Sequence, residues 1–82
     1  QLFNAKNNLA LVRGLQGNYQ LPAIPMTERE RAQILHNLGV IATRREERDI
    51  ARGLFAAAVE THPQFYQEAA DKLAALEPKV EN

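Results

Sequence analysis

The sequence predicts an all-α domain of about four helices that pack as antiparallel hairpins. Three observations lead to this prediction. Apolar residues recur at spacings of three and four along most of the chain, as on one face of an amphipathic helix. The prolines stand between these periodic segments. Alanine, the strongest helix former, is frequent within them and permits close approach of two helices.

Composition limits the classes of partner. Ten basic and ten acidic residues cancel, which argues against a nucleic-acid partner. The longest apolar run, 54–59, is far shorter than the ~20 residues that span a bilayer. The absence of cysteine excludes disulfides and thiolate metal sites, and leaves both cytoplasm and periplasm open. Because the chain of 82 residues begins at Gln1, we expect a single domain that is part of a longer chain.

The first helix is predicted over residues 1–16. Gly17 is expected to end it, because glycine adopts the left-handed conformation of a helix C-terminus without strain. A loop over 17–26 follows, since Pro22 and Pro25 disfavour helix. The apolar stripe expected to be buried consists of Leu2, Ala5, Leu9, Val12 and Leu15.

The second and third helices are marked by clear signals at their ends. Thr27 and Glu30 form a capping box at the start of the second helix. The charged residues 44–47 interrupt the apolar pattern and predict a turn, and Pro63 ends the third helix. The second stripe is Ala32, Leu35, Leu38, Gly39 and Ala42. The third is Ile50, Ala51, Leu54, Phe55 and Ala58.

A fourth helix is predicted over 64–77, because Pro63 suits the first turn of a helix and the apolar spacing resumes. Its stripe is Phe65, Ala69, Leu73 and Leu76. Residues 78–82 form a polar tail.

The spacing in the middle of the chain resembles the tetratricopeptide repeat (TPR), a helix pair of about 34 residues. The resemblance is strongest over 32–65, and the positions that match the signature are Leu35, Leu38, Gly39, Ala51, Phe55, Ala58 and Pro63. Two positions depart, since Ala42 stands for the usual tyrosine and Glu46 for a common glycine. The resemblance implies TPR-like hairpins in a short right-handed solenoid, with 27–63 as one full repeat.

The first helix resembles half of a second, degenerate repeat, because Asn8-Leu9-Ala10 aligns with Asn37-Leu38-Gly39. The loop 17–26 then replaces the second helix of that repeat, and 64–77 is a further or capping helix. The stretch NNLALVRGLQGNY is also similar to bacterial TPR proteins of secretion and pilus assembly.

The loop has three readings. Leu21, Ile24 and Met26 can cover apolar surface that the missing helix leaves bare. The loop can instead lie along the concave groove of the solenoid, where it would mimic a bound peptide or gate access for one. Finally, these apolar residues can form an exposed hook for a partner.

In TPR proteins the first helix of each repeat lines a groove for an extended peptide, so the resemblance implies a peptide-binding site. The matching positions here are Asn7, Asn8, Leu11, His36, Asn37, Val40 and Arg44, with Gln64 and Phe65 at the groove's edge. Asparagine both donates and accepts, so Asn8 and Asn37 can pair with a peptide backbone, or can equally bond within the scaffold.

Other candidate sites are weaker. Arg44, Arg45, Arg48 and Arg52 predict a solvated ion-pair network, although Arg44 can also bind an acidic peptide terminus. The two histidines, His36 and His62, lie on different helices, and no metal site, cofactor or catalytic motif is expected.

Three functions remain open. The first is a non-catalytic interaction module or scaffold that binds a peptide or partner helix in the TPR groove. The second is a structural element of a larger complex, with homo-oligomerisation or stacking on neighbouring repeats. The third is a regulatory appendage to an enzyme elsewhere in the chain.

Overall fold

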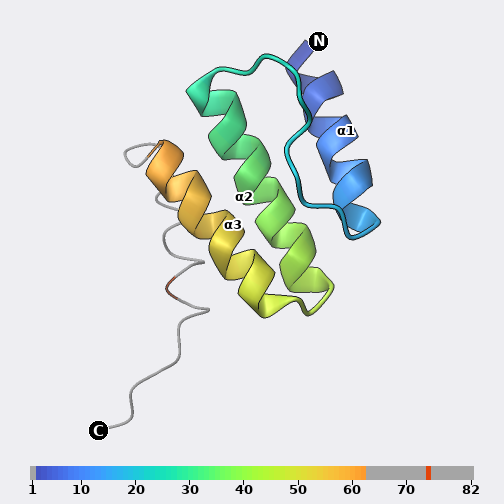
Figure 1. Ribbon diagram of the computed structural model, residues 1–82, viewed down its shortest axis with the longest axis vertical. Helices are drawn as coiled ribbons and strands as arrows, with labels where there is room; N and C mark the ends of the chain where they lie inside the picture. Colours follow the sequence, from blue (N-terminus) through green and yellow to red (C-terminus); the bar gives the residue numbers. More distant parts are fainter. Residues whose placement is uncertain (1, 63–73, 75–82) are drawn as a thin grey trace, which may run out of the picture.

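In the part of the chain that the structure describes, three helices lie side by side, with α2 between α1 and α3 (Figure 1). The structure is a computed structural model that describes residues 2–62 and Ala74. Its helices are α1 (Leu2–Leu15), α2 (Glu28–Arg44) and α3 (Arg48–Thr61), and no strand occurs among the described residues. The all-α prediction is therefore confirmed for this part of the chain. The predicted fourth helix, 64–77, and the tail, 78–82, lie outside it except for Ala74, which is helical.

The end of α1 is closed by a Schellman motif around Gly17. The backbone N–H of Asn18 donates to the carbonyl of Arg13, and that of Gly17 donates to Gly14, each at 2.9 Å. Gly17 has φ +89°, the left-handed conformation that glycine adopts without strain. The predicted role of Gly17 is confirmed, with the helix ending at Leu15.

The start of α2 is fixed by the predicted capping box. The Glu30 N–H donates to the Thr27 hydroxyl oxygen, and the Thr27 N–H donates to the Glu30 carboxylate, both at 3.0 Å. Two N–H groups that the helix itself leaves unpaired are satisfied in this way.

The predicted turn between α2 and α3 is confirmed and repeats the Schellman pattern with an unusual residue. The N–H of Glu47 donates to the carbonyl of Ala42 at 2.9 Å, and that of Glu46 donates to Thr43 at 3.0 Å. Glu46 has φ +62°, a conformation that costs an L-residue about 1–2 kcal/mol. Glu46 thus stands where TPR sequences commonly have glycine, and its left-handed backbone conformation is the kind that favours glycine.

The α2–α3 contact is the tightest part of the core. A Cβ built on Gly39 would lie 2.6 Å from Cε1 of Phe55, so this ring occupies the space above the glycine. Phe55, Ala51 and Ala58 are buried with Leu35, as the apolar stripes predict. One member of the α3 stripe was assigned wrongly, because Ile50 is 42% exposed.

The predicted buried stripe of α1 is wrong. Leu9, Val12 and Leu15 are exposed, and so is Ala5. The side chain of Leu2 is outside the described residues. The face that packs against α2 instead consists of Phe3, Ala10, Leu11 and Gly14.

Small residues explain this choice of face. Ala10 is fully buried, and a Cβ on Gly14 would lie 2.7 Å from Cδ2 of Leu38. The helix has apolar residues on two faces, and the one that carries the small residues allows the closer approach to α2.

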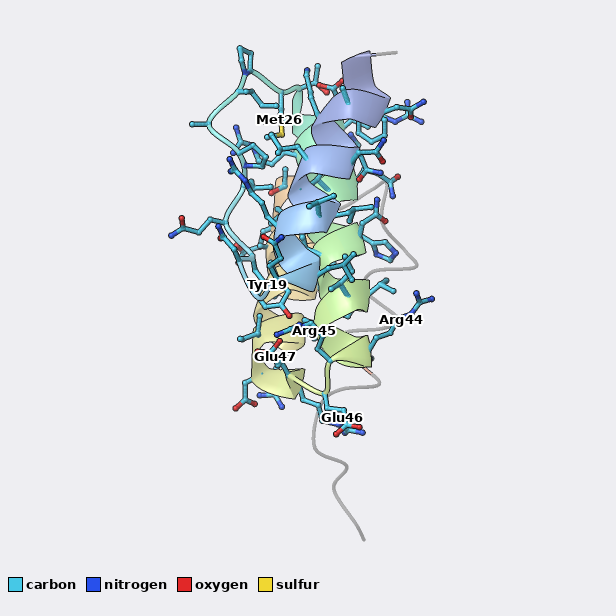
Figure 2. All side chains as sticks on the ribbon, turned by 90° about the vertical axis from the view of Figure 1, so that its right-hand side faces the viewer. Tyr19, Met26, Arg44, Arg45, Glu46 and Glu47 are labelled. Atoms are coloured by element: carbon cyan, nitrogen blue, oxygen red, sulfur yellow. The ribbon has the colours of Figure 1, made fainter. Side chains whose placement is uncertain are left out.

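The loop between α1 and α2 covers the core on one side. Pro22 is buried, and Tyr19, Leu21 and Met26 pack against the buried cluster formed by Ala10 of α1 and by Ile34 and Leu38 of α2. Figure 2 shows Tyr19 and Met26 on the opposite side of α1 from Arg44. The covering role is confirmed for Leu21 and Met26, but Ile24 remains 36% exposed.

Candidate functional site

A row of side-chain amides joins α1 to α2. Asn37 donates from Nδ2 to Oδ1 of Asn7 at 3.0 Å, and Gln33 donates from Nε2 to Oδ1 of Asn37 at 3.2 Å. All three side chains are half-buried, so the row is accessible from outside. Each asparagine has more donor and acceptor positions than these two bonds use. The row can therefore offer N–H and C=O groups to a ligand while it holds the two helices together.

The residues around this row form what we call the amide face. Its helical positions recur at i, i+4, i+7 and i+11 on α2, a single stripe of that helix. Leu11 and Val40 are half-buried on it, whereas Asn8 and Arg44 are exposed. The members are Asn7, Asn8, Leu11, Gln33, Asn37, Val40 and Arg44.

One of the residues expected at the groove lies elsewhere, and two are not described. His36 is buried, with its ring centre 5.5 Å from that of Phe55, so it lies at the α2–α3 contact. Gln64 and Phe65 are outside the described residues.

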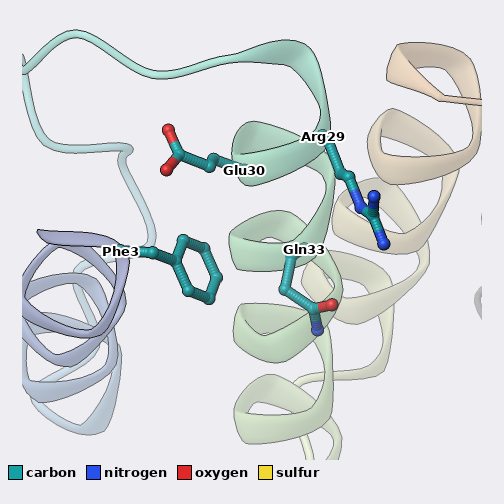
Figure 3. A pocket seen from close by; sticks show the side chains of 4 residues that line it. All are labelled: Phe3, Arg29, Glu30 and Gln33. Carbon is teal, nitrogen blue, oxygen red and sulfur yellow. The ribbon is translucent and has the colours of Figure 1, made fainter. Parts of the chain in front are cut away.

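A pocket of about 250 Å³ adjoins the amide row at the start of α2. It is lined by Phe3, Arg29, Glu30 and Gln33, and Figure 3 shows the ring of Phe3 reaching from α1 toward Glu30 and Gln33 on α2. Sequence reasoning missed these residues. The spacing could have found two of them, since Phe3 and Gln33 stand one helical turn before Asn7 and Asn37.

The charge at this pocket is held in place by an ion pair between the helices. The ammonium of Lys6 lies 3.0 Å from Oε1 of Glu30. The backbone N–H of Thr27, and then the side chain of Lys6, lower the pKa of the Glu30 carboxyl below its ordinary value of 4.5. Glu30 is therefore an anchored carboxylate at neutral pH.

A second cluster joins the loop to the α2–α3 turn. The Tyr19 hydroxyl donates to Oε1 of Glu47, and Arg45 donates to the same atom from Nε at 2.9 Å. Arg45 also donates from Nη1 to the carbonyl of Leu15 at 2.9 Å, which reaches the end of α1.

The pKa shifts in this cluster follow from its contacts. Burial, and then the bond to Glu47, raise the pKa of Tyr19. The bonds from Tyr19 and then from Arg45 lower the pKa of Glu47. The cluster holds the loop at Tyr19 against the α2–α3 turn and the end of α1. Its charged groups, Arg45 and Glu47, are paired with each other within the cluster.

Some arginines of the predicted cluster form ion pairs, and Arg44 does not. Arg45 pairs with Glu47, and Arg52 approaches Asp49 at 3.7 Å, as the ion-pair reading predicts. Arg44 is exposed and forms no ion pair with the described residues. The guanidinium of Arg44 therefore lies at one end of the amide face, available to an anion.

The described part of the chain lacks two other kinds of feature. No three His, Cys, Asp or Glu side chains within it gather as metal ligands would. None of its helices combines the length and apolarity needed to cross a membrane.

Comparison with known proteins gives no relative from which to transfer a function. No family model, curated protein or solved structure matches the chain significantly. The features of the molecule that bear on function are therefore the amide face, the adjoining pocket and the residues that resemble a TPR.

Proposed function

We propose that this chain is a non-catalytic protein–protein interaction module that holds an extended peptide or a partner helix on the amide face. The observation that carries the proposal is the row of amides from Asn7 through Asn37 to Gln33, which spans α1 and α2. The loop leaves this side uncovered, since Tyr19 and Met26 lie on the opposite side of α1 from Arg44 (Figure 2).

The chemistry of the face suits a peptide backbone. An extended peptide presents N–H and C=O groups in alternation, and a side-chain amide pairs with either. Leu11 and Val40 add apolar surface beside the row. Arg44 can form a bidentate contact with a carboxylate at one end of the peptide. The pocket beside Phe3 and Gln33 can take one apolar side chain at the other.

The TPR resemblance supports this assignment. The contact of Gly39 with Phe55, and the burial of Ala51 and Ala58, agree with the small-against-large packing of a TPR helix pair. On this view α2 and α3 are one repeat, and α1 is the first helix of a degenerate one. We extend the proposal to a short right-handed solenoid, in which first helices line the concave side.

A peptide selection tests the proposal. Peptides are selected from a random displayed library against the full chain, synthesised, and titrated while amide resonances are followed by NMR. We expect shifts concentrated on the side-chain NH2 groups of Asn7, Gln33 and Asn37. Substitution Arg44→Ala should weaken binding of peptides with a carboxylate about tenfold.

The matched control is Arg48→Ala, an exposed arginine on α3 that lies outside the amide face. It should leave affinity unchanged. Selected peptides that shift other residues, or that tolerate Arg44→Ala but not Arg48→Ala, would contradict the site. A selection that yields no binding peptide would contradict the proposed function itself.

One observation favours a second candidate function, a structural element of a larger assembly. The exposed apolar side chains of α1 have no partner among the described residues, although helices of soluble proteins normally turn charged residues outward. The two functions use different surfaces and are compatible.

A further inference from the structure

The carboxylate of Glu30 accepts hydrogen bonds through only one of its two oxygens. Lys6 and the backbone N–H of Thr27 both donate to Oε1, each at 3.0 Å. No described residue donates to Oε2, although each carboxylate oxygen has two lone pairs. Glu30 is half-buried and lines the pocket at the start of α2. The pocket therefore contains an anionic group whose second oxygen is available to a ligand.

Lys6 reaches Glu30 from the loop side rather than from this pocket. It lines a different hollow, beside the loop, and is absent from the lining of the pocket at Phe3. In Figure 3 the Glu30 carboxylate and the Phe3 ring extend into the same space between α2 and α1. The ion pair thus holds the carboxylate in place and leaves the side next to the ring open.

The size of the pocket and the ring within it favour one aromatic side chain as the occupant. The volume of about 250 Å³ is below the ~300 Å³ at which pockets begin to hold drug-sized molecules. An aromatic ring would gain offset-stacked or edge-to-face contact with Phe3 in addition to the area that it buries. A purely apolar ring, however, would cover Oε2 of Glu30 without giving it a partner, which is unfavourable for a polar atom. The side chain that fits therefore also donates a hydrogen bond.

An uncharged donor suits this acceptor better than a cation does. Lys6 already neutralises Glu30, and the guanidinium of Arg29 lines the pocket. A further ammonium or guanidinium would therefore meet two cations around one carboxylate. A serine or threonine hydroxyl donates without charge but brings no ring to Phe3. The phenol of tyrosine combines an uncharged donor with an aromatic ring.

The protein itself contains a contact of this type. At the α2–α3 turn the Tyr19 hydroxyl donates to Glu47, and Arg45 donates to the same carboxylate oxygen. A glutamate that is paired with a cation thus still accepts a phenol, and Glu30 with Lys6 offers the same combination. Hydrogen bonds to a charged acceptor are roughly twice as strong as those between neutral groups.

We propose that this pocket is a tyrosine subsite of the amide face, in which the phenol ring packs on Phe3 and its hydroxyl donates to Oε2 of Glu30. The inference rests on the proposed function in that the tyrosine belongs to a peptide held on the amide face. It names the side chain that this peptide places beside Gln33, at the opposite end of α2 from Arg44.

A pair of small probes tests the subsite without any peptide. N-acetyltyrosinamide and N-acetylphenylalaninamide differ only in the hydroxyl, and each is titrated into the full chain while NMR follows the ring of Phe3 and the side-chain amide of Gln33. We expect the tyrosine probe to bind about tenfold more tightly, because only its hydroxyl gives Oε2 of Glu30 a partner. Equal affinities, or shifts confined to other residues, would overturn the subsite. So would a tyrosine probe that does not bind at about 10 mM.

Two variants separate the hydroxyl from the ring. Glu30→Gln keeps a residue that completes the capping box but removes the charge, so the preference for the tyrosine probe should fall at least about threefold. Phe3→Leu should weaken both probes and leave their ratio unchanged, because both rings contact Phe3. Circular dichroism checks that each variant remains helical, and Phe3→Leu keeps the test valid if Glu30→Gln does not.

The matched control is Glu47→Gln, which removes a carboxylate of the same kind outside the pocket. The ratio of the two probe affinities should stay as it is in the parent. An equal fall of this ratio in Glu47→Gln and Glu30→Gln would assign the effect to overall charge and would overturn the role of Glu30.

Peptides selected on the full chain connect the subsite to the proposed function. Replacing tyrosine by phenylalanine in a selected peptide should lower its affinity about tenfold, and by less in Glu30→Gln. Peptides that bind the amide face equally well in both forms, or that carry no tyrosine, would overturn the subsite and leave the interaction module intact. Binding of the tyrosine probe where no peptide binds would support the subsite and contradict the proposed function.

Discussion

The ring of Phe55 on α3 lies directly over the backbone of Gly39 on α2. A Cβ at position 39 would be 2.6–2.8 Å from three carbons of that ring, closer than real side chains approach one another. The ring is only 1% exposed and is enclosed by its neighbours, so it has little room to move away. This contact sets how closely α2 and α3 pack.

Replacing Gly39 should therefore be costly, although alanine is the better helix former. We expect Gly39→Ala to lower the free energy of unfolding by about 2–3 kcal/mol, because the added methyl group overpacks the α2–α3 contact. Urea denaturation followed by circular dichroism measures the change. Gly53→Ala is the matched control, since no described residue outside its own stretch of helix has an atom within 4 Å of its added Cβ. It should raise the free energy of unfolding by up to about 1 kcal/mol. Equal changes in the two variants would show that the ring does not constrain position 39.

The left-handed residue of the α2–α3 turn offers a stabilising substitution. Glu46 has φ +62°, and Glu46→Gly should remove that strain and raise the free energy of unfolding by about 0.5–1 kcal/mol. Glu46→Ala keeps a Cβ in the same conformation and should give no such gain. If the alanine variant is stabilised as much as the glycine variant, the cause is loss of the charge rather than relief of backbone strain.

Within the amide face, Asn37 should contribute to stability and Asn8 should not. Asn37 bonds both Asn7 and Gln33, whereas Asn8 is exposed. We expect Asn37→Ala to cost about 1–2 kcal/mol in free energy of unfolding, and Asn8→Ala to stay within about 0.5 kcal/mol. Thermal and urea unfolding of the two variants provide the comparison. An Asn37→Ala variant as stable as the parent would mean that the amide bonds contribute nothing to α1–α2 packing.

Acid should loosen the loop by protonating Glu47. Its pKa in the folded protein is below the ordinary value of 4.5, so it stabilises the fold above that pH. This contribution is lost as the pH falls below 4.5 through the lowered folded value. The free energy of unfolding should therefore decline over this range, and less steeply in Glu47→Gln.

Tyr19→Phe separates the two partners of that carboxylate. The hydroxyl of Tyr19 is the largest cause of the lowered pKa of Glu47, ahead of Arg45. The pKa of Glu47, followed by NMR, should therefore move back toward 4.5 in the Tyr19→Phe variant without reaching it. An unchanged pKa would show that Arg45 alone holds the carboxylate in its charged form.

The candidate site could be predicted in part. The TPR resemblance selected Asn7, Asn37 and Arg44, and the structure brings Asn7 and Asn37 into contact. The TPR resemblance did not indicate that Asn37 also bonds Gln33, or that Phe3 and Gln33 line a pocket. Those relations depend on how α1 is shifted and rotated against α2, which no signal within either helix specifies.

The sequence by itself determined the features that depend on residues close together in the chain. The capping box of Thr27 and Glu30, the left-handed Gly17 and the turn at Glu46 each depend on hydrogen bonds within a few residues. The TPR resemblance also selected Gly39 and Phe55 as signature positions, but their direct contact is a finding of the structure.

Only the tertiary structure decided which side of α1 is buried. Both sides are apolar, so periodicity favoured the side with the larger residues, Leu9 and Val12, and that prediction was wrong. The helix instead turns Ala10 and Gly14 toward Leu38, because small residues let two backbones approach and bring more atoms into contact. Packing of this kind depends on the shapes of both helices, whereas the pattern of apolar residues in one helix describes only that helix.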